Sequence, residues 1–233
     1  MQNEIKAVLF DVDGTLYNQN KLRVIIAITV ILSCIIFPFT AIRKLKVIKH
    51  YRMSQETLRQ NDNLCSDLGA EQIRLTAEKT GIDVEKVKMI VSKWFEEVPL
   101  IFLPLCKKKD LYKTFKNLFL QNIQLGLFSD YPSQNKAKAL KLDAFITSYV
   151  CSTDPDVGKF KPDPKGFIKS SEKMGIPVIN FLYVGDRAEV DVVGANLSGM
   201  DAVLIGKLPE NDKRNYSIRE LNELENIIKL KNE

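Results

Sequence analysis

Residues 5–17 read IKAVLFDVDGTLY, and this stretch decides the fold. Its first part is an apolar run interrupted only by Lys6, which predicts a short buried strand from Ile5 to Phe10. Two aspartates, Asp11 and Asp13, follow at once and lead into a glycine turn. Carboxylates placed directly after a strand are expected at the carboxyl edge of an open α/β sheet, which is where ligands bind in such sheets.

Further apolar runs predict the other buried strands, at Ile123–Phe128, Phe145–Val150, Phe181–Val184 and Ala202–Ile205. Helical patterns separate these runs, at Lys136–Leu140, Asp163–Met174 and Asp191–Ser198. Strands that alternate with helices favour right-handed βαβ units, and continuous apolar strands fit a sheet covered on both faces. The sequence therefore predicts a doubly wound, Rossmann-like parallel α/β core. A closing helix is expected from about Ser217, because Ser217 and Glu220 have the spacing of a capping box.

The interval between the first two predicted strands, from about Tyr17 to Asn122, is far longer than one crossover connection. It has helical periodicity at 54–68, 70–80 and 84–97. Gly81 is expected to end one helix and Asp83 to cap the next. We therefore expect an α-helical domain of residues 18–109, inserted into a core domain made of residues 1–17 and 110–233.

Composition excludes several classes of site. The net charge of +5 is spread along the chain, which favours solvated faces over a nucleic-acid surface, so no nucleic-acid partner is expected. The single histidine, His50, leaves no basis for a histidine triad or a multi-histidine metal site. The four cysteines are far apart and form no C-x-x-C pair. Without a secretory signal before the first strand, the expected location is cytoplasmic.

Polar residues follow four of the predicted strands. The first strand leads into Asp11 and Asp13, the second into Ser129-Asp130, the third into GKFKPDP at 158–164, and the fourth into Gly185-Asp186 with Asp191 beyond. An anionic nucleophile can attack a phosphate only where charge is neutralised, as a lysine and a divalent cation can do. Converging carboxylates also repel one another unless a cation lies between them, and Mg²⁺ prefers such hard oxygen ligands. The pattern therefore predicts Mg²⁺-assisted phosphate chemistry.

The motifs D-x-D-G-T-L, S-D, K-P-D-P and G-D-x-x-x-x-D, in this order, resemble the haloacid dehalogenase (HAD) superfamily. The resemblance covers the first 17 residues and about 120–206. It implies that the helical insertion is the cap domain of that superfamily. It also implies a Mg²⁺-dependent phosphatase that hydrolyses a phosphomonoester through an aspartyl-phosphate.

The resemblance implies a role for each motif residue. Asp11 would be the nucleophile, and Asp13 would be the general acid that later acts as the base for water. Because dehalogenases of the superfamily lack an acid at the position of Asp13, phosphoryl transfer is favoured over carbon–halogen cleavage. The metal would be held by one oxygen of Asp11, the backbone carbonyl of Asp13 and the carboxylate of Asp186.

The resemblance also implies the phosphate ligands, which would be Ser129 and Lys161, with Lys159 as the competing lysine. Asp191 would hold Lys161 or a metal-bound water without binding the metal itself. Two other functions stay open: a phosphomutase of the same superfamily, and a membrane-associated relative without activity. The second is disfavoured because every acidic and basic motif residue is present.

Residues 24–42 form an uncharged apolar segment of about 19 residues, long enough to be a transmembrane candidate. A single crossing would separate Asp11 from Lys161 and Asp186, so we expect none. Three alternatives stay open: burial within the cap, a homodimer contact through the cap, and peripheral contact with a membrane surface, with a bend near Pro38. Membrane contact would suit an amphiphilic substrate such as a lipid phosphate, whereas the other two leave any small-molecule phosphate open.

Overall fold

The computed structural model describes residues 4–36, 38–60, 67–208, 212 and 214–233, and the side chains of 33–41 lie outside this description. The chain divides into two compact units. One consists of Met1–Asn18 with Lys107–Glu233, and the other is Gln19–Cys106.

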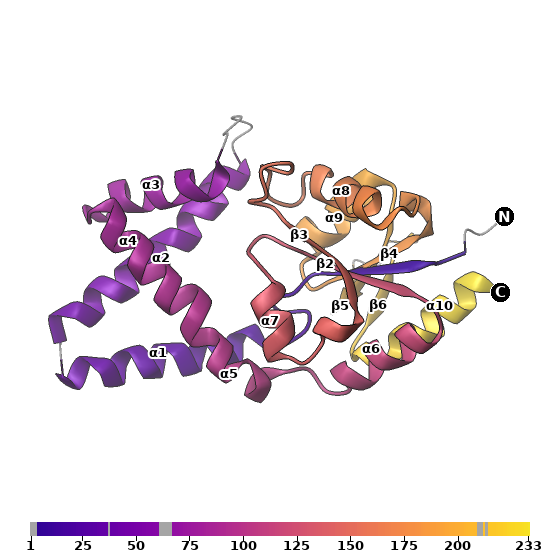
Figure 1. The fold of residues 1–233 in the computed structure, drawn as a ribbon, viewed down its shortest axis with the longest axis horizontal. Coiled ribbons are helices and arrows are strands. Elements are labelled where there is room, and N and C mark those ends of the chain that lie inside the picture. Colours follow the sequence, from indigo (N-terminus) through magenta and orange to yellow (C-terminus); the bar gives the residue numbers. More distant parts are fainter. Residues whose placement is uncertain (1–3, 37, 61–66, 209–211, 213) are drawn as a thin grey trace. The chain divides into compact units, whose positions relative to one another are not determined.

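A six-stranded sheet forms the centre of the first unit, and every neighbouring pair of strands is parallel (Figure 1). The strands are β1 (Ala7–Phe10), β2 (Gln124–Ser129), β3 (Ile146–Cys151), β4 (Phe181–Gly185), β5 (Asp201–Ile205) and β6 (Tyr216–Ile218). Their order is β3-β2-β1-β4-β5-β6. The chain winds outward from β1 to β3 and then returns to β4 on the other side of β1. The predicted doubly wound α/β fold is therefore confirmed.

Helices cover both faces of this sheet, with α8 and α9 over one face and α6 and α10 over the other (Figure 1). The helices are α6 (Leu111–Leu120), α7 (Gln134–Ala139), α8 (Lys165–Met174), α9 (Val193–Ser198) and α10 (Leu224–Asn232). A π-helical turn at Ala188–Val192 leads into α9. Short 3₁₀ turns lie at Asp143–Phe145, Val178–Asn180 and Leu221–Glu223. All of the predicted core helices are present, with shifted ends.

The predicted start of the last helix at Ser217 is wrong. Ser217 lies in β6, where it pairs with Leu204 of β5, so its backbone is extended. The capping box belongs instead to Glu220 and Glu223, just before α10. A three-residue strand carries too little apolar pattern to be predicted, and its pairing with β5 overrides the local capping signal.

The register of the central strands positions the carboxyl edge of the sheet. Phe10 of β1 lies opposite Leu127 of β2 and Val184 of β4. The next residue, Asp11, donates its backbone N–H to Val184 O at 2.8 Å. The first motif aspartate is therefore fixed between the ends of two neighbouring strands.

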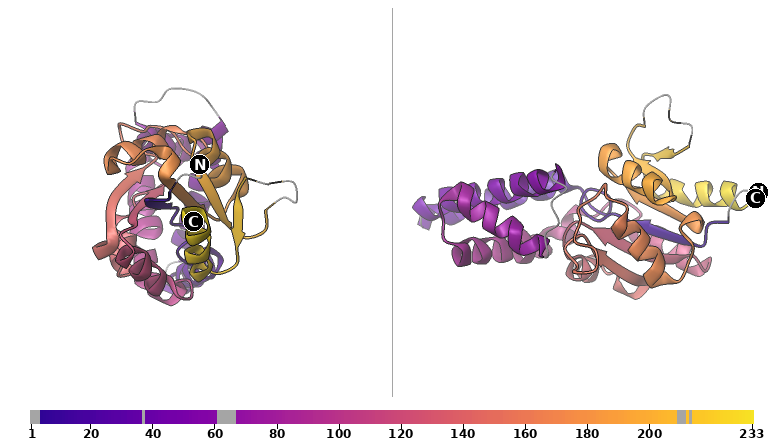
Figure 2. Two further views of the ribbon diagram at one scale, coloured as in Figure 1. Left: turned by 90° about the vertical axis from the view of Figure 1, so that its right-hand side faces the viewer. Right: turned by 90° about the horizontal axis from the view of Figure 1, so that it is seen from above.

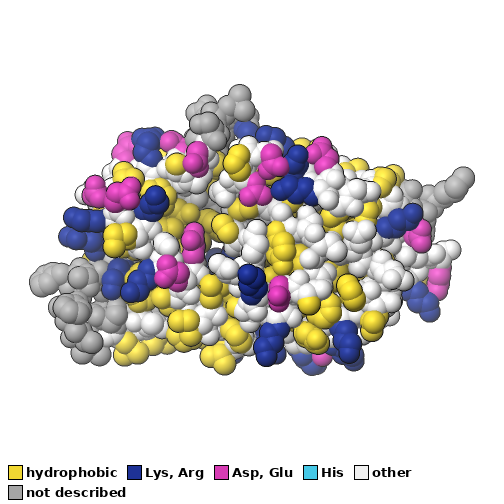
Figure 3. Space-filling view, in the orientation of Figure 1, with side chains coloured by type: hydrophobic (Ala, Val, Ile, Leu, Met, Phe, Trp, Pro, Cys, Tyr) yellow, Lys and Arg dark blue, Asp and Glu magenta, His cyan; other side chains and the backbone are white. Residues whose placement is uncertain are grey.

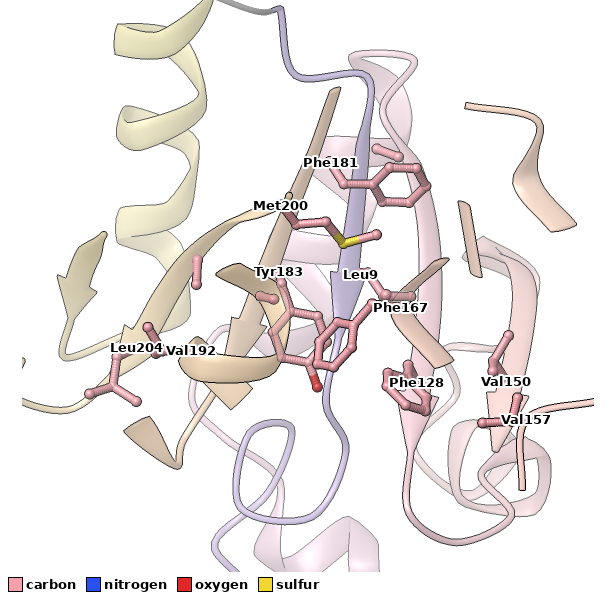
Figure 4. Packing of buried hydrophobic residues seen from close by; sticks show 13 residues of the cluster. Leu9, Phe128, Val150, Val157, Phe167, Phe181, Tyr183, Val192, Met200 and Leu204 are labelled. Carbon is pink, nitrogen blue, oxygen red and sulfur yellow. The ribbon is translucent and has the colours of Figure 1, made fainter. Parts of the chain in front are cut away.

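Aromatic side chains fill the space between the sheet and α8 (Figure 4). The Phe167 ring lies 4.9 Å from the Phe128 ring and 4.8 Å from the Tyr183 ring, measured between centroids. Gly166 allows this close approach, because a Cβ there would lie 2.1 Å from the Phe128 ring. The packing fixes α8 against the sheet and with it the loop before α8.

Helices joined by short connections make up the described residues of the second unit (Figures 1 and 2). Its helices are α1 (Gln19–Ile36), α2 (Pro38–Gln60), α3 (Leu68–Thr80), α4 (Val84–Val91) and α5 (Val98–Cys106), with a π-helical segment at Ser92–Glu97. Gly81 ends α3 with φ +67°, and the Asp83 side chain accepts from the Lys86 N–H, so both predicted helix ends are confirmed.

The predicted helix at 54–68 agrees with α2 as far as the description extends, to Gln60. It does not run unbroken to Leu68, because Asp67 is extended and caps α3 by accepting from the Ala70 N–H. Residues 61–66 lie outside the described residues. An N-cap aspartate favours a new helix start over continuation of the old one.

The apolar segment 24–42 is divided between α1 and α2. Among the described residues, no helix combines the length and the apolar character that a membrane span requires. Val30 is buried and packs with Trp94, whereas Val24, Ile28 and Ile31 are each more than half exposed. Burial within the cap therefore applies to one side of α1, because the described side chains on its other side are exposed to solvent.

We predict that Phe167→Ala lowers the free energy of unfolding by about 3–5 kcal/mol, because it empties the contact between α8 and the sheet. Ile168→Ala is the matched control, since Ile168 is the next residue of α8 and is 40% exposed. Urea unfolding of both variants measures the difference. Equal losses in the two variants would contradict this account of the core.

Candidate active site

Asp11 lies directly after β1 and is almost completely buried, with 5% of its surface exposed. The chain turns at Gly14, whose φ is +106°, and brings Thr15 back toward the strand end. The Thr15 hydroxyl donates to Asp11 Oδ2 at 3.0 Å. The carboxylate is thus held in a defined orientation by its own loop.

Lys161, from the loop between β3 and α8, supplies a buried ammonium to this carboxylate. Its Nζ donates to Asp11 Oδ1 at 2.6 Å, to Asp191 Oδ1 at 2.7 Å and to the Tyr183 hydroxyl at 3.0 Å. Burial alone would lower the pKa of Lys161, but the two carboxylates raise it well above its usual value. Lys161 therefore remains a cation between two aspartates.

Asp191, in the π-helical turn after β4, has both carboxylate oxygens engaged by the chain. Oδ1 accepts from Lys161 and Tyr183, and Oδ2 accepts from the backbone N–H groups of Asp186 at 3.1 Å and Arg187 at 3.0 Å. These bonds fix the backbone of the loop that carries Asp186. Asp191 therefore holds the Lys161 ammonium and the backbone at Asp186 in place.

Asp186 has a different environment. Its Oδ1 is buried and has no hydrogen-bond partner among the described residues. Asp11, Asp186 and Asp191 each contribute one oxygen to a group whose atoms lie within 4.8 Å of one another. An unpartnered buried carboxylate oxygen beside two other carboxylates is a place where a cation is expected.

The pKa values show the same crowding of negative charge. Burial, together with Asp191, raises the pKa of Asp186 to about 6. Burial, with Asp191 and Asp186, raises the pKa of Asp11 to about 8 in spite of the opposing Lys161 ammonium. A hard divalent cation would relieve this repulsion, and the all-oxygen donor set suits one.

Gly14 makes room for this arrangement. A Cβ at position 14 would lie 2.1 Å from Asp186 Oδ2. No side chain can therefore occupy this position without moving the Asp186 carboxylate. The glycine is required both by its positive φ and by the close approach of Asp186.

Asp13 has a cationic partner of its own. Its Oδ1 accepts from Lys136 Nζ at 2.6 Å and from the Tyr17 hydroxyl. Burial would raise the pKa of Asp13, but the Lys136 ammonium and the hydrogen bonds from Lys136 and Tyr17 outweigh burial and lower it. The pKa values of the two aspartates of the first motif are thus shifted in opposite directions although they are two residues apart.

Ser129 ends β2, the strand beside β1, and is buried. Its Oγ accepts from the Tyr131 N–H at 3.4 Å and has no hydrogen bond to the aspartates in the described part of the chain. The neighbouring Asp130 accepts from the Ser152 hydroxyl at 2.8 Å and from the Lys161 N–H at 3.3 Å. Asp130 therefore connects the ends of β2 and β3 to the loop that carries Lys161.

The structure brings Asp11, Lys161, Asp186 and Asp191 into one cluster, and it places Lys161 rather than Lys159 against the Asp11 carboxylate. Sequence reasoning missed Thr15, Tyr17, Tyr183 and Lys136. The spacing of four residues from Asp11 to Thr15 and from Asp13 to Tyr17 was an available signal, as was the hydroxyl of Tyr183 in an apolar strand. The sequence around Lys136 gives no such signal, because its helix contains a second lysine, Lys138, in the same kind of sequence.

The chain is similar to a curated protein named glyceraldehyde 3-phosphate phosphatase from Methanopyrus kandleri, with 29% identity over 91% of this chain and 89% of the relative. Among solved structures it is similar to a 2-haloacid dehalogenase from Pseudomonas syringae pv. Tomato, with a TM-score of 0.68, 21% identity, and coverage of 97% of this chain and 99% of the other. It is also similar to a HAD phosphatase from Thermococcus onnurineus, with a TM-score of 0.59, 22% identity, and coverage of 96% and 98%.

These structural similarities show the fold, which dehalogenases and phosphatases share. The family model described as haloacid dehalogenase-like hydrolase matches residues 5–199, which include every predicted motif. The match spans both the strand ends that carry the aspartate cluster and the helical insertion. The chain therefore belongs to the haloacid dehalogenase-like hydrolases, as the motifs at 11–16, 129–130, 161–164 and 185–191 predict.

Proposed function

We propose that this hydrolase is a Mg²⁺-dependent phosphatase that hydrolyses a phosphomonoester through an aspartyl-phosphate on Asp11. The contact that carries the proposal is the buried ion pair between Lys161 Nζ and Asp11 Oδ1, at 2.6 Å. It supplies the positive charge that an anionic nucleophile needs beside an anionic phosphate. The relative named a phosphatase supports the choice of reaction, and so does the carboxylic acid at position 13.

In the first half of the reaction, an Asp11 carboxylate oxygen attacks phosphorus and the ester oxygen leaves. Thr15 and Lys161 hold the two oxygens of Asp11, so the plane of the carboxylate is fixed before substrate binds. Lys161 also neutralises part of the charge on the transferring phosphoryl group. Asp13 protonates the leaving oxygen.

In the second half, water attacks the phosphoryl group on Asp11, and Asp13 takes the proton of that water. Ser129 is suited to bind a phosphoryl oxygen. Its Oγ accepts one hydrogen bond from Tyr131, and its own proton has no acceptor among the described residues. A buried hydroxyl with a free proton is a donor ready for an anion.

The residues that would hold Mg²⁺ are Asp11, Asp186 and the backbone carbonyl of Asp13. Asp191 would support them through the Asp186 N–H and Lys161 without giving up its own hydrogen bonds. The cation would neutralise charge on the nucleophile and on the phosphoryl group. The unpartnered Oδ1 of Asp186 supports this assignment.

The substrate is proposed to be a small-molecule phosphate, and glyceraldehyde 3-phosphate is the first to test because of the named relative. A phosphomutase would instead require a sugar bisphosphate as phosphoryl donor. A lipid phosphate would require detergent or vesicles for turnover. A panel of sugar, nucleotide and lipid phosphates, with and without detergent, distinguishes these classes.

An apolar face on the helical unit bears on that choice. Val24, Ile28, Ile31 and Leu32 lie at helical spacing on α1 and are 58%, 51%, 56% and 57% exposed. Ile101 and Leu105 of α5, which packs beside α1, are also exposed. Figure 3 shows hydrophobic side chains gathered along these two helices. We call these six residues the α1–α5 face.

We further propose that the α1–α5 face contacts an anionic membrane surface. Arg23 and Arg43 are exposed near the two ends of the apolar segment, so positive charge flanks the face. Apolar side chains flanked by cations complement anionic lipid headgroups. A second copy of the chain would need no such charge, and self-association is the competing outcome of the test below.

We predict that Asp11→Asn lowers Mg²⁺-dependent phosphate release by about 10⁴-fold or more, because the amide cannot become the phosphate acceptor. Asp143→Asn is the matched control, since Asp143 is exposed on the same unit. The measurement is phosphate release from an aryl phosphate. Mg²⁺-dependent turnover by Asp11→Asn at the rate of the control would refute the proposed nucleophile.

We predict that Gly14→Ala weakens Mg²⁺ binding by roughly 10- to 100-fold, because the new Cβ displaces the Asp186 carboxylate. Gly175→Ala controls for backbone strain, since Gly175 also has a positive φ but has no atom within 4 Å of a built Cβ. Calorimetric titration with Mg²⁺ gives both affinities without any turnover. Unchanged affinity in Gly14→Ala would remove Asp186 from the proposed metal site.

We predict that the protein sediments with phosphatidylglycerol vesicles and less with phosphatidylcholine vesicles. Ile28→Glu with Ile31→Glu should abolish sedimentation, because both substitutions charge the α1–α5 face. Ile179→Glu is the control, since Ile179 is similarly exposed on the other unit. Absence of sedimentation together with a dimer in analytical ultracentrifugation would assign the face to a second copy instead.

A further inference from the structure

Lys136 is a buried lysine that the mechanism above does not use. It lies on α7, and only 9% of its side-chain surface is exposed. Its near neighbour on the same helix, Lys138, is exposed. Burying an ammonium costs free energy unless a counter-ion and hydrogen bonds compensate, so a specific partner must hold Lys136 inside.

That partner is Asp13, 123 residues away in the chain. Lys136 Nζ lies 2.6 Å from Asp13 Oδ1, and the Tyr131 ring lies 6.0 Å from the same ammonium. Lys136 forms its ion pair with Asp13 and with no other carboxylate of the described residues. The buried charge is therefore directed at the residue proposed as acid and base.

A second donor meets the same oxygen. The Tyr17 hydroxyl donates to Asp13 Oδ1, and the two residues are four positions apart in the chain. The other oxygen, Oδ2, accepts no hydrogen bond from the part of the chain that the structure describes. Two donors on one oxygen fix the side-chain rotamer and leave the other oxygen free for proton exchange.

We propose that Lys136 and Tyr17 are positioning residues that hold the Asp13 carboxyl by Oδ1, so that Oδ2 exchanges the proton with the leaving oxygen and later with water. This inference rests on the proposed phosphatase function. In the first half, the Asp11 oxygen–phosphorus bond forms while the ester phosphorus–oxygen bond breaks, and the Oδ2 proton moves to the departing alkoxide. In the second half, water gives that proton back to Oδ2 and its hydroxide oxygen to phosphorus, which frees Asp11.

A misplaced acid should matter most where the leaving group needs a proton. An alkoxide is a poor leaving group and depends on general-acid catalysis, whereas 4-nitrophenolate leaves without a proton. The parameter kcat/KM reports the steps up to loss of the alcohol, so it isolates the acid role. The ratio of kcat/KM for glycerol phosphate to that for 4-nitrophenyl phosphate is therefore the readout.

We predict that Lys136→Met lowers this ratio by roughly 10- to 100-fold, and that Tyr17→Phe lowers it in the same direction. Lys136→Arg should restore part of the ratio, because the guanidinium can still donate to Oδ1. Lys138→Met is the matched control on the same helix and should leave the ratio unchanged. Thermal unfolding of each variant checks that the fold is retained.

The possible results separate the two proposals. An unchanged ratio in Lys136→Met, with or without an equal loss of activity on both substrates, would overturn the positioning role while the phosphatase function stands. A rise in KM alone, equal for both substrates, would also overturn it and make Lys136 a phosphate ligand. If the unmodified protein with Mg²⁺ hydrolyses neither these esters nor the wider substrate panel, while it binds Mg²⁺, the proposed function itself fails.

Discussion

The site depends on the ion pairs that the buried ammonium of Lys161 forms with two aspartates. The ammonium lies between Asp11 and Asp191 at 2.6 and 2.7 Å, and all three side chains are almost completely buried. Charges removed from water in this way are stable only when each has a partner. The three residues come from the position after β1, from the loop before α8 and from the turn after β4, so this charge pairing joins three separate parts of the chain.

Negative charge exceeds positive charge in this cluster. Asp11, Asp186 and Asp191 contribute three carboxylates, and Lys161 contributes one ammonium to the same group. Burial, together with the excess negative charge, raises the pKa of Asp11 to about 8 and that of Asp186 to about 6. A divalent cation would neutralise the excess and leave the site able to accept an anion.

The sequence predicted the parts of the molecule that local patterns encode. Apolar runs identified five of the six strands, and polar residues after those runs identified the cluster, because parallel strands bring their carboxyl ends to one edge. Local pattern failed where tertiary pairing decides the structure. Ser217 has the features of a helix cap but pairs with β5, and Lys136 is one of several helical lysines until the fold places it on Asp13.

The pKa shifts of Asp11 and Asp13 are opposite to those that their proposed roles require. Burial and like charges raise the pKa of Asp11, whose proposed role as nucleophile requires an ionised carboxylate. Lys136 helps to lower the pKa of Asp13, whose proposed role as acid requires a protonated carboxyl. A cation beside Asp11 and Asp186 would lower the pKa of Asp11, and a phosphate dianion near Asp13 would raise that of Asp13. Under the proposed mechanism, both carboxyl groups would reach the protonation states that they need only when metal and substrate are bound together. Opposed environments for neighbouring carboxylates are a recurring way to divide acid and nucleophile roles, and the roles proposed for this chain would be divided in this way once both ligands are bound.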